Sequence, residues 1–298
     1  MPERSRARAA PLPPISTLMP QLFLKMRPTF DGNSSLMAAG SMFVMNDVYI
    51  LPLVSGLQPS STADFRHALY GAIGSYSLLK KIAETSPKDY GKLLWTPARE
   101  CLVLIGSCEF DDPLDELLQV FEFTGFGNAR INHFARFTLI TLADIVDLVR
   151  QGTLETGMPA TAVGSPALRI SADAPLKEAI DRMLAQGVRR LFIEGKRPTF
   201  VSDRSIISFM FSGVRIPLVK ENPAVWIDAK VSDTRLQHAP VMTAGGTLAE
   251  AATIIGPNPD ACVLTDDDKV VSRWDIVMKP WKARDLLPKA TDQGAESS

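Results

Sequence analysis

The sequence contains little cysteine and histidine, and their positions argue against a metal site. Among 298 residues there are three of each. Cys101, Cys108 and Cys262 lie in apolar stretches such as CLVLIG and DACVLT, where a thiol behaves as a small buried hydrophobe. Neither these cysteines nor the histidines have the spacing of zinc ligands. We therefore expect no disulfide, no metal and a reducing, cytoplasmic compartment.

The sequence also lacks an excess of charge and a long apolar run. The net charge of −1 creates no global field that would recruit nucleic acid or an acidic membrane. No apolar run reaches the roughly 18 residues of a membrane span, because stretches such as MFVMNDVYILPLV are interrupted by Asn46 and Asp47. The opening MPERSRARAAPLPP lacks the apolar core of a secretory signal. We expect a soluble protein that contacts no membrane.

Motifs that carry catalysis are missing as well. There is no GxxxxGK[ST] loop and no GxSxG turn, and no cysteine has a recognisable partner base. The segment from Gly125 to Gly127 follows a predicted helix and precedes a strand, the reverse of the order in a dinucleotide-binding fingerprint. The sequence therefore predicts a protein that is not an enzyme.

One unit, strand, helix, strand, strand and helix, recurs four times along the chain. The clearest copy reads ALRIS, LKEAIDRMLAQG, VRRLFIEG, TFVS and DRSIISFMF, and its first helix repeats apolar residues at helical spacing. The last strand-to-helix junctions of the copies align at Gly74, Thr141, Ser202 and Ser272. These junctions lie 67, 61 and 70 residues apart. A repeat of this length suits a small α/β (α+β) subdomain rather than a solenoid repeat.

The linkers between the copies are rich in Pro, Gly and Ser, and they define the expected domains. One unit exposes an apolar sheet face that it cannot cover alone, so the copies should associate as two pairs. The predicted division is a flexible arm over 1–26, four repeats over 27–84, 97–153, 156–213 and 226–283, and a flexible tail over 284–298.

These units resemble the cystathionine-beta-synthase (CBS) domain. The resemblance covers the chain from about Arg27 to Trp281 and is strongest in ALRISADAPLKEAIDRMLAQGVRRLFIEG. Four copies are similar to the gamma subunit of the AMP-activated kinase and to prokaryotic tandem CBS proteins. The resemblance implies two pseudo-symmetric pairs that form a disc, with clefts for AMP, ADP, ATP or S-adenosylmethionine and no obligatory cofactor.

The family's binding signature is a Ser or Thr at the end of a strand and an Asp three residues later. The two complete matches are Thr141 with Asp144 and Ser272 with Asp275. A helix N-terminus suits a phosphate, and the resemblance assigns the carboxylate to the ribose hydroxyls. The same spacing is also a helix capping box, which occurs in proteins that bind nothing.

The other two copies depart from this signature. In the third copy Ser202 keeps the hydroxyl, but Ser205 replaces the aspartate, and in the first copy Gly74 and Ser77 replace both residues. We therefore expect at most two well-formed ribose sites.

The resemblance also places basic residues near the phosphates. Arg189 and Arg190 stand where related domains present His and Arg, and Arg130 falls similarly in the second copy, whereas Tyr49 and Ala261 replace the basic residue elsewhere. A guanidinium suits phosphate better than an ammonium does. The alternative is that these arginines are solvated charges at strand ends.

Three functions stay open at this stage. The first is a regulatory module that senses an adenine nucleotide and transmits its occupancy to a partner protein on another chain. The second is a scaffold for interaction, such as a homodimer, with degenerate ligand sites. The third, nucleic-acid binding through Arg4, Arg6 and Arg8, is disfavoured by the near-neutral charge.

Overall fold

The computed structural model describes residues 11–22, 29–46, 50–54, 69–134, 136–256, 258 and 260–288. Several predicted features lie outside these residues, namely Arg4, Arg6 and Arg8 of the arm, Tyr49, and the tail from 289.

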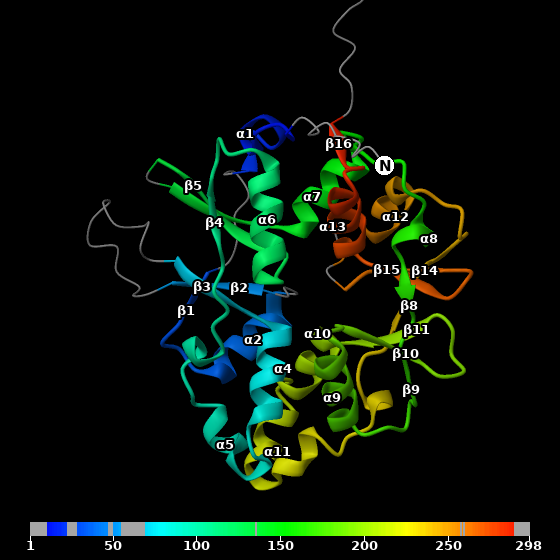
Figure 1. The fold of residues 1–298 in the computed structure, drawn as a ribbon. Helices are drawn as coiled ribbons and strands as arrows, with labels where there is room; N and C mark the ends of the chain where they lie inside the picture. Colours follow the sequence, from blue (N-terminus) through cyan, green and yellow to red (C-terminus); the bar gives the residue numbers. More distant parts are fainter. Residues whose placement is uncertain are drawn as a thin grey trace, which may run out of the picture.

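Each of the four repeats has the predicted order of strand, helix, strand, strand and helix, as Figure 1 shows. Repeat 1 contains β1 (Phe30–Asp31), α2 (Leu36–Asn46), β2 (Ile50–Val54), β3 (Leu69–Gly74) and α4 (Ser75–Glu84). Repeat 2 contains β4 (Ser107–Glu109), α6 (Leu114–Thr124), β5 (Asn128–His133), β6 (Arg136–Thr141) and α7 (Leu142–Arg150).

The second half of the chain repeats this order. Repeat 3 contains β9 (Arg169–Ile170), α9 (Leu176–Gln186), β10 (Arg190–Ile193), β11 (Thr199–Ser202) and α10 (Asp203–Met210). Repeat 4 contains β13 (Val241–Met242), α12 (Leu248–Ile255), β14 (Val263–Thr265), β15 (Lys269–Val271) and α13 (Arg273–Ala283). In every repeat the first two strands are parallel and the last two antiparallel. The mixed α/β fold class is therefore confirmed.

Local sequence explains where the first helices of repeats 2 and 3 begin and end. Each follows a proline, Pro113 before α6 and Pro175 before α9, and each ends at a glycine with positive φ. Gly125 has φ of 67° and Gly187 has φ of 63°, a conformation that costs a residue with a Cβ free energy. The apolar stripes of both helices are buried. The glycine at the end of each helix lets the chain turn sharply back into the next strand.

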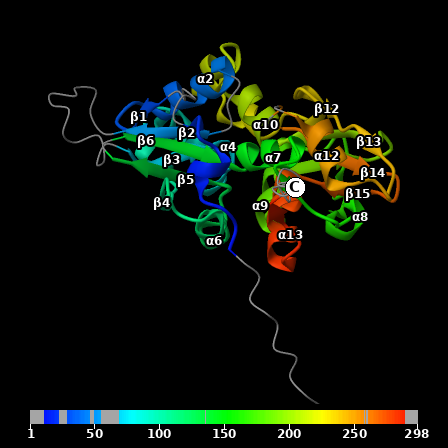
Figure 2. The ribbon, with the colours of Figure 1, turned by 90° about the horizontal axis from the view of Figure 1, so that it is seen from above.

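The repeats associate in two ways. Repeats 1 and 2 form one module and repeats 3 and 4 a second, and the two modules lie side by side in Figure 2. Within the second module Phe192, Phe200 and Leu264 form part of an apolar cluster between the sheets. Within the first, the backbone of Ala72 exchanges two hydrogen bonds with Val103, of 3.0 and 2.8 Å.

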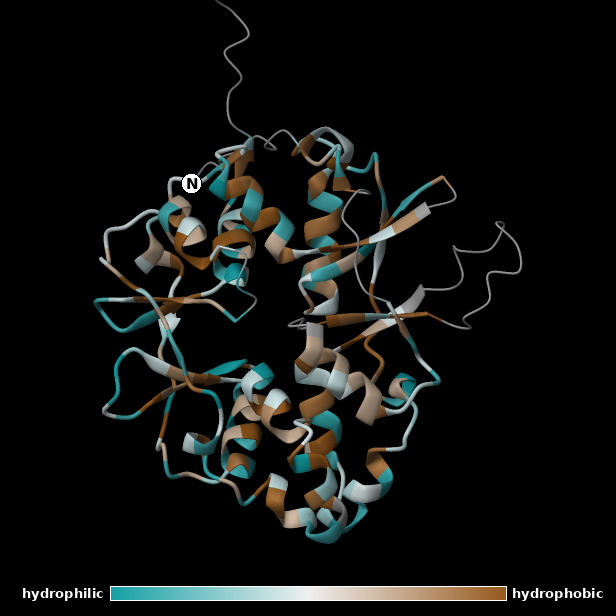
Figure 3. Ribbon diagram, turned by 180° about the vertical axis from the view of Figure 1, so that it is seen from behind, coloured by the Kyte–Doolittle hydropathy of each residue, from teal (hydrophilic) through white to brown (hydrophobic). Residues whose placement is uncertain are grey.

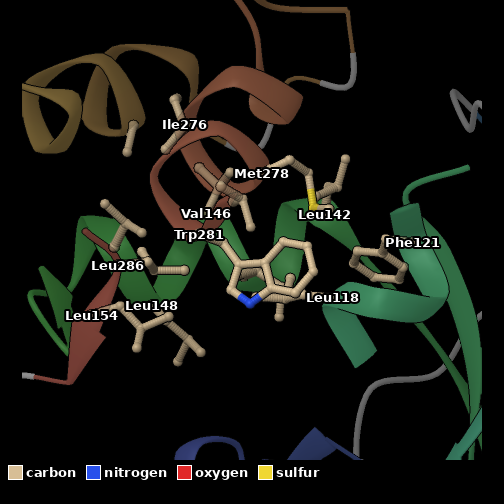
Figure 4. Close-up of a cluster of buried hydrophobic side chains, with 14 of the residues drawn as sticks. Leu118, Phe121, Leu142, Val146, Leu148, Leu154, Ile276, Met278, Trp281 and Leu286 are labelled. Carbon is tan, nitrogen blue, oxygen red and sulfur yellow. The ribbon is translucent and has the colours of Figure 1, made fainter. Parts of the chain in front are cut away.

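Helices join the two modules. One core unites repeats 1 and 3, where α10 packs on α2 and α4, and the other unites repeats 2 and 4, where α7 packs on α12 and α13. Figure 4 shows Trp281 of α13 among Leu118 and Phe121 of repeat 2. Hydrophobic residues follow the strands and the helices that meet between repeats (Figure 3). The four repeats therefore close into a ring.

Short elements precede, connect and follow the repeats. They are α1 (Ile15–Leu18), η2 (Pro87–Asp89), α5 (Tyr90–Leu93), η3 (Ala98–Cys101), β7 (Leu154–Glu155), α8 (Ala160–Val163), β8 (Ser165–Pro166), α11 (Arg215–Glu221), η4 (Pro223–Trp226), η5 (Val231–Asp233), β12 (Gln237–His238) and β16 (Leu287–Pro288). Two of them cross between repeats, since β8 pairs with β15 and β12 with β11.

The ends of the described chain are more ordered than expected. Leu12, Ile15 and Leu22 are buried in the core of repeats 2 and 4, and the Leu12 amide donates to Asp115 Oδ2 over 2.6 Å. At the other end, β16 pairs with β7. The predictions of a flexible arm and a flexible tail are therefore wrong for residues 11–22 and 284–288, because their apolar side chains complete a core.

Two expected repeat boundaries also fall inside packed segments. Ala98 and Cys101 contribute to the core of repeats 1 and 3, although they follow the boundary set at 97. Trp226 and Val231 contribute to the same core, although the fourth repeat was expected to begin at 226. Each linker docks on the repeat that precedes it, where it covers the start of the first helix, as in the hydrogen bond of 2.8 Å from the Leu176 amide to Ala229 O.

The three cysteines are free and buried, as predicted. Burial raises the pKa of the Cys101 and Cys108 thiols to about 12, so they stay protonated at neutral pH. Within the described part of the chain, no helix is long and apolar enough to cross a membrane.

Candidate functional site

A cavity of about 420 Å³ lies where the four repeats meet. Repeats 1 and 2 supply an apolar and aromatic part of its lining, which includes Ile50, Tyr76, Val103 and Phe126. Repeats 3 and 4 supply three arginines together with Ser272 and Trp274. We call this cavity the open cleft. It is the cleft of the first module, and residues of the second module line its opposite side.

The charge of the open cleft has one sign. Arg189, Arg190 and Arg273 line it, and none of the described lining residues is Asp or Glu. Cationic guanidinium groups beside apolar walls suit an anion that carries a flat apolar group. The arrangement can therefore hold a phosphate or carboxylate at one end and a ring system at the other.

Arg189 is fixed by a polar network between repeats 1 and 3. Its Nε donates to Asp203 Oδ2 over 2.8 Å and its Nη2 donates to Ser75 Oγ over 3.0 Å. Ser75 Oγ in turn donates to Asp203 Oδ2 over 2.7 Å. Asp203 and Ser75 occupy the first positions of α10 and α4, so Arg189 ties together the starts of two helices. The Asp203 carboxylate offsets part of its charge.

Arg190 and Arg273 are held by backbone carbonyls. Arg190 donates from Nε to Asp260 O over 2.8 Å and from Nη2 to Ala261 O over 3.3 Å. Arg273 donates from Nη2 to Gly256 O and Asn258 O, over 3.0 and 2.7 Å. Carbonyls are neutral acceptors, so the bonds to Arg190 orient its guanidinium without neutralising it.

Two further polar groups face the open cleft. Burial and the Asp203 carboxylate raise the pKa of Tyr76, against a smaller lowering by Arg189, so the phenol stays protonated and can donate at neutral pH. Asn128 is 5% exposed, and its Oδ1 has no hydrogen-bond partner among the described residues. A buried acceptor without a donor is costly, and a ligand that supplies a donor would relieve that cost.

The two complete signature pairs are closed on themselves. Asp144 Oδ2 accepts from the Thr141 amide over 2.8 Å and from Thr141 Oγ1 over 2.9 Å. Asp275 Oδ2 accepts from the Ser272 amide over 2.9 Å and from Ser272 Oγ over 2.6 Å. These are capping boxes, the alternative that the spacing left open.

Lys279 adds a third partner to the fourth repeat's pair. Its Nζ lies 2.8 Å from Asp275 Oδ1, one turn along α13. Ser272 lines the open cleft, whereas Thr141, Asp144 and Asp275 are absent from its described lining.

The strand register corrects the position assigned to Arg130. Arg190 pairs with Ser202 at the end of β11, and the residue that pairs with Thr141 at the end of β6 is Asn128. Arg130 pairs with Leu139, two residues further along. The prediction that Arg130 stands where Arg189 and Arg190 do is therefore wrong, because the spacing in sequence did not reveal the register.

The equivalent cleft of the second module contains an ion pair. Arg204 Nη1 lies 2.9 Å from Asp260 Oδ2, and Gln237 Nε2 donates to the same oxygen over 2.7 Å. Ser205 completes the network, since its Oγ accepts from Gln237 over 3.2 Å and lies 3.0 Å from Ser202 Oγ. Arg204 and Asp260 are 8% and 4% exposed. We call this space the filled cleft.

The register shows which residues distinguish the two clefts. Tyr76 and Arg204 are each the second residue of the corresponding helices α4 and α10. Val103 bridges Ala72 as Gln237 pairs with Phe200. Counting back from the pairs at the two helix starts likewise matches Phe126 with Asp260. An apolar or aromatic residue in the first module thus corresponds to a member of the polar network in the second.

Some of these residues could be predicted from the sequence and others could not. Of the predicted residues, Arg189, Arg190 and Ser272 come together at the open cleft, whereas Ser202 lies in the filled cleft. Tyr76, Phe126 and Asn128 were not predicted as site residues. Tyr76 follows a strand-to-helix junction, whereas Phe126 and Asn128 lie where a helix leads into a strand. These positions were the available signal, but the residue types do not belong to the family's signature.

Comparisons with known proteins identify the fold. No family model matches the chain, and no curated protein matches its sequence. The structure is similar to that of a Methanocaldococcus jannaschii protein described as a proposed archaeal homologue of g-AMPK. The TM-score is 0.70 and the identity 16%, over 86% of this chain and 96% of that one.

Shorter proteins match one part of the chain. A CBS-domain protein from Pyrobaculum aerophilum, complexed with AMP, covers 44% of this chain with 88% of its own, at TM-score 0.33 and 13% identity. The CBS domain pair of protein MJ0100, in complex with 5′-methylthioadenosine and S-adenosyl-L-methionine, covers 46% with 96% of its own, at TM-score 0.33 and 18% identity. The fold assignment rests on the first, longer match. The chain has the fold of a tandem CBS protein, built from four repeats.

Proposed function

We propose that this protein is a non-catalytic regulatory module that binds an adenine nucleotide in the open cleft and transmits occupancy to a partner protein. The observation that carries the proposal is the lining of the open cleft, where Arg189, Arg190 and Arg273 face an apolar and aromatic wall. The nucleotide's phosphate would lie against the arginines and its base against Phe126 and Tyr76. A volume of about 420 Å³ is within the usual range of small-molecule sites.

The polar groups of the cleft favour an adenine nucleotide over other anions. Asn128 lines the open cleft, and a change of its side-chain rotamer that uncovers Oδ1 would let it accept from an exocyclic amino group, as asparagine pairs with adenine in nucleic-acid recognition. The arginines favour AMP, ADP or ATP over S-adenosylmethionine, whose sulfonium is positively charged. The proposal needs no catalytic group and no metal.

Occupancy could regulate a partner because the open cleft is bounded by both modules. A ligand that touches repeats 1 and 2 with its base and repeats 3 and 4 with its phosphate stabilises one arrangement of the ring. Such a ligand shifts an equilibrium between arrangements only if it binds them with different affinity. The partner would recognise the favoured arrangement.

The proposal is tested by titrating the full chain with AMP and with adenosine by calorimetry, for wild type and for Arg190→Met. We expect wild type to bind AMP, and the substitution to weaken AMP binding by about tenfold or more, the value of a charged hydrogen bond. Adenosine affinity should change less than about twofold, because adenosine has no phosphate for Arg190 to contact.

A matched control separates the site from general effects of charge. Arg182 lies on the surface of α9 in an ion pair with Glu178 at 3.7 Å, and its side chain is 43% exposed. Arg182→Met should leave both affinities unchanged. Equal losses of AMP and adenosine in Arg190→Met would show that Arg190 does not contact the phosphate.

A scaffold function is the second candidate, and the filled cleft favours it. In the filled cleft Arg204 and Asp260 pair with each other at 2.9 Å instead of presenting their charges to a ligand, as expected of a degenerate site. Absence of binding of AMP, ADP, ATP and S-adenosylmethionine to wild type would favour this reading, with homodimerisation checked by light scattering.

A further inference from the structure

The side chain of Arg190 connects the open cleft to the filled cleft. Arg190 lines the open cleft, and both of its carbonyl acceptors, Asp260 O and Ala261 O, belong to the segment that supplies the ion pair of the filled cleft. Asp260 therefore uses two groups at once. Its carbonyl holds Arg190, and its carboxylate is held by Arg204 and Gln237.

These contacts fix Asp260 at more than one point. The Asp260 amide donates to Asn258 Oδ1 over 3.1 Å, and its carboxylate accepts from two side chains over 2.9 and 2.7 Å. A residue anchored through its amide and its carboxylate has little freedom to move its carbonyl. The direction in which that carbonyl points sets the direction of the Arg190 guanidinium, since the Nε–H and Nη2–H groups lie in one plane.

The equivalent position in the first module shows that the fold does not require an aspartate there. Phe126 corresponds to Asp260, and its side chain lines the open cleft instead of forming an ion pair. The Arg204–Asp260 pair is buried on both sides, and a buried ion pair is on average no more stabilising than well-packed apolar residues. Stability alone therefore does not account for it.

We infer that Asp260 is a positioning residue for Arg190, so that the ion pair of the filled cleft sets how strongly the open cleft binds a phosphate. This inference rests on the proposed function and assigns a role to the ion pair of the filled cleft. The carboxylate of Asp260 does not contact the ligand. It holds the backbone that aims Arg190, as a second layer of residues orients the ligands of a metal site.

The coupling acts in both directions. If breaking the ion pair weakens phosphate binding, a bound phosphate must strengthen the ion pair by the same factor, because binding free energies are reciprocal. A ligand bound in the open cleft would then strengthen the Arg204–Asp260 ion pair at the interface between repeats 3 and 4, although the ligand does not contact that pair.

The test measures AMP and adenosine affinities of the full chain with Asp260→Asn. This change removes the charge that holds Arg204 and keeps the size of the side chain. We expect AMP affinity to fall by about tenfold, the low end of the loss typical of a displaced supporting group, and adenosine affinity to change less than about twofold. The ratio of the two affinities is the readout, because a merely structural defect would lower both.

A second variant guards against misfolding. Removing one partner of a buried ion pair can destabilise a protein strongly, whereas replacing both by apolar residues is often neutral. The double variant Arg204→Leu, Asp260→Leu should therefore fold, and it should show the same selective loss of AMP affinity.

Phe192→Leu is the matched control. Phe192 is 1% exposed in the apolar cluster between the same two repeats, so its truncation loosens that interface without touching the ion pair. It should lower the melting temperature and leave the ratio of AMP to adenosine affinity unchanged.

The outcomes separate the two proposals. If Arg190→Met weakens AMP binding selectively but both Asp260 variants bind AMP like wild type, Asp260 does not position Arg190 and the proposed function survives. If wild type binds no adenine nucleotide, both proposals are overturned. If Phe192→Leu changes the ratio as much as Asp260→Asn does, the effect belongs to the interface in general, and the role of Asp260 is disproved.

Discussion

The carboxylates of Asp144 and Asp275 each accept two hydrogen bonds from the N-cap residue of their own helix. A carboxylate at the third position of a helix also interacts favourably with the helix dipole. The family resemblance assigns both aspartates to a ribose, but neither lies in the described lining of the open cleft. In the structure both act on the helix to which they belong.

Asp144→Ala is therefore expected to change stability rather than binding. The free energy of unfolding should fall by about 1 kcal/mol, the usual value of a lost helix cap. AMP affinity should change less than about twofold, because Asp144 does not line the open cleft and would not contact AMP bound there. Denaturant unfolding measures the change in stability, and calorimetry of the same preparation measures AMP affinity. A selective loss of AMP affinity would show that Asp144 binds the ribose after all.

For single residues, the sequence predicted which residues cap a helix, but it did not predict which side chains line the open cleft. A hydroxyl and a carboxylate three residues apart predict a capped helix wherever they occur, as at Thr141. Whether the pair also opens into a cavity depends on side chains from other repeats. Phe126 and Arg273, which lie 147 residues apart by their numbers, line the same cavity only because the ring closes.

The helix crossing between α2 and α10 depends on a glycine. A Cβ at Gly40 would lie 2.0 Å from Cδ1 of Phe211, far inside van der Waals contact. Phe211 is 2% exposed in the core that joins repeats 1 and 3, so its ring has little room to move. The absent side chain lets helices of two modules pack closely.

Gly40→Ala should therefore destabilise the protein, although glycine to alanine in an open helix stabilises by about 1 kcal/mol. We expect a loss of about 1 to 3 kcal/mol, the range for overpacking a core. Gly91→Ala in α5 is the control, since a Cβ there meets no atom within 4 Å, and it should be neutral or stabilising. A partial rescue of Gly40→Ala by Phe211→Leu in chemical denaturation would locate the clash.

Elements of the repeat could be predicted because their patterns are local. The apolar stripe of α9 and its flanking Pro175 and Gly187 mark a helix without any knowledge of its neighbours. The exchange of β8 and β12 between repeats could not be predicted in this way. Each contributes two residues to a neighbour's sheet, and their partners are set by the packing of whole repeats.

The whole molecule is a ring in which every repeat shares a core with a repeat of the other module. Repeats 1 and 3 share one core and repeats 2 and 4 the other, while contacts between the sheets join the two repeats within each module. Each repeat therefore contacts two other repeats, so separating one pair also disturbs the other contacts of the ring. A ligand bound in the open cleft would contact all four repeats.

Saturating AMP should consequently stabilise the entire fold. At a concentration about 100 times Kd, binding contributes about 2.7 kcal/mol to the native state. For a chain of this size that raises Tm by about 5 °C. Differential scanning calorimetry with and without AMP measures the shift. Two resolved transitions, only one of which moves, would mean that the modules unfold independently and that the ligand contacts one of them.

The correspondence of Tyr76 with Arg204 and of Phe126 with Asp260 also bears on how such a protein could evolve. Four copies of one structural unit offer equivalent clefts, and few positions separate an open cleft from a filled one. The number of ligands that the ring can hold is thus open to change by point mutation, without alteration of the fold. A descendant could acquire a second site or lose the first and still keep the scaffold intact.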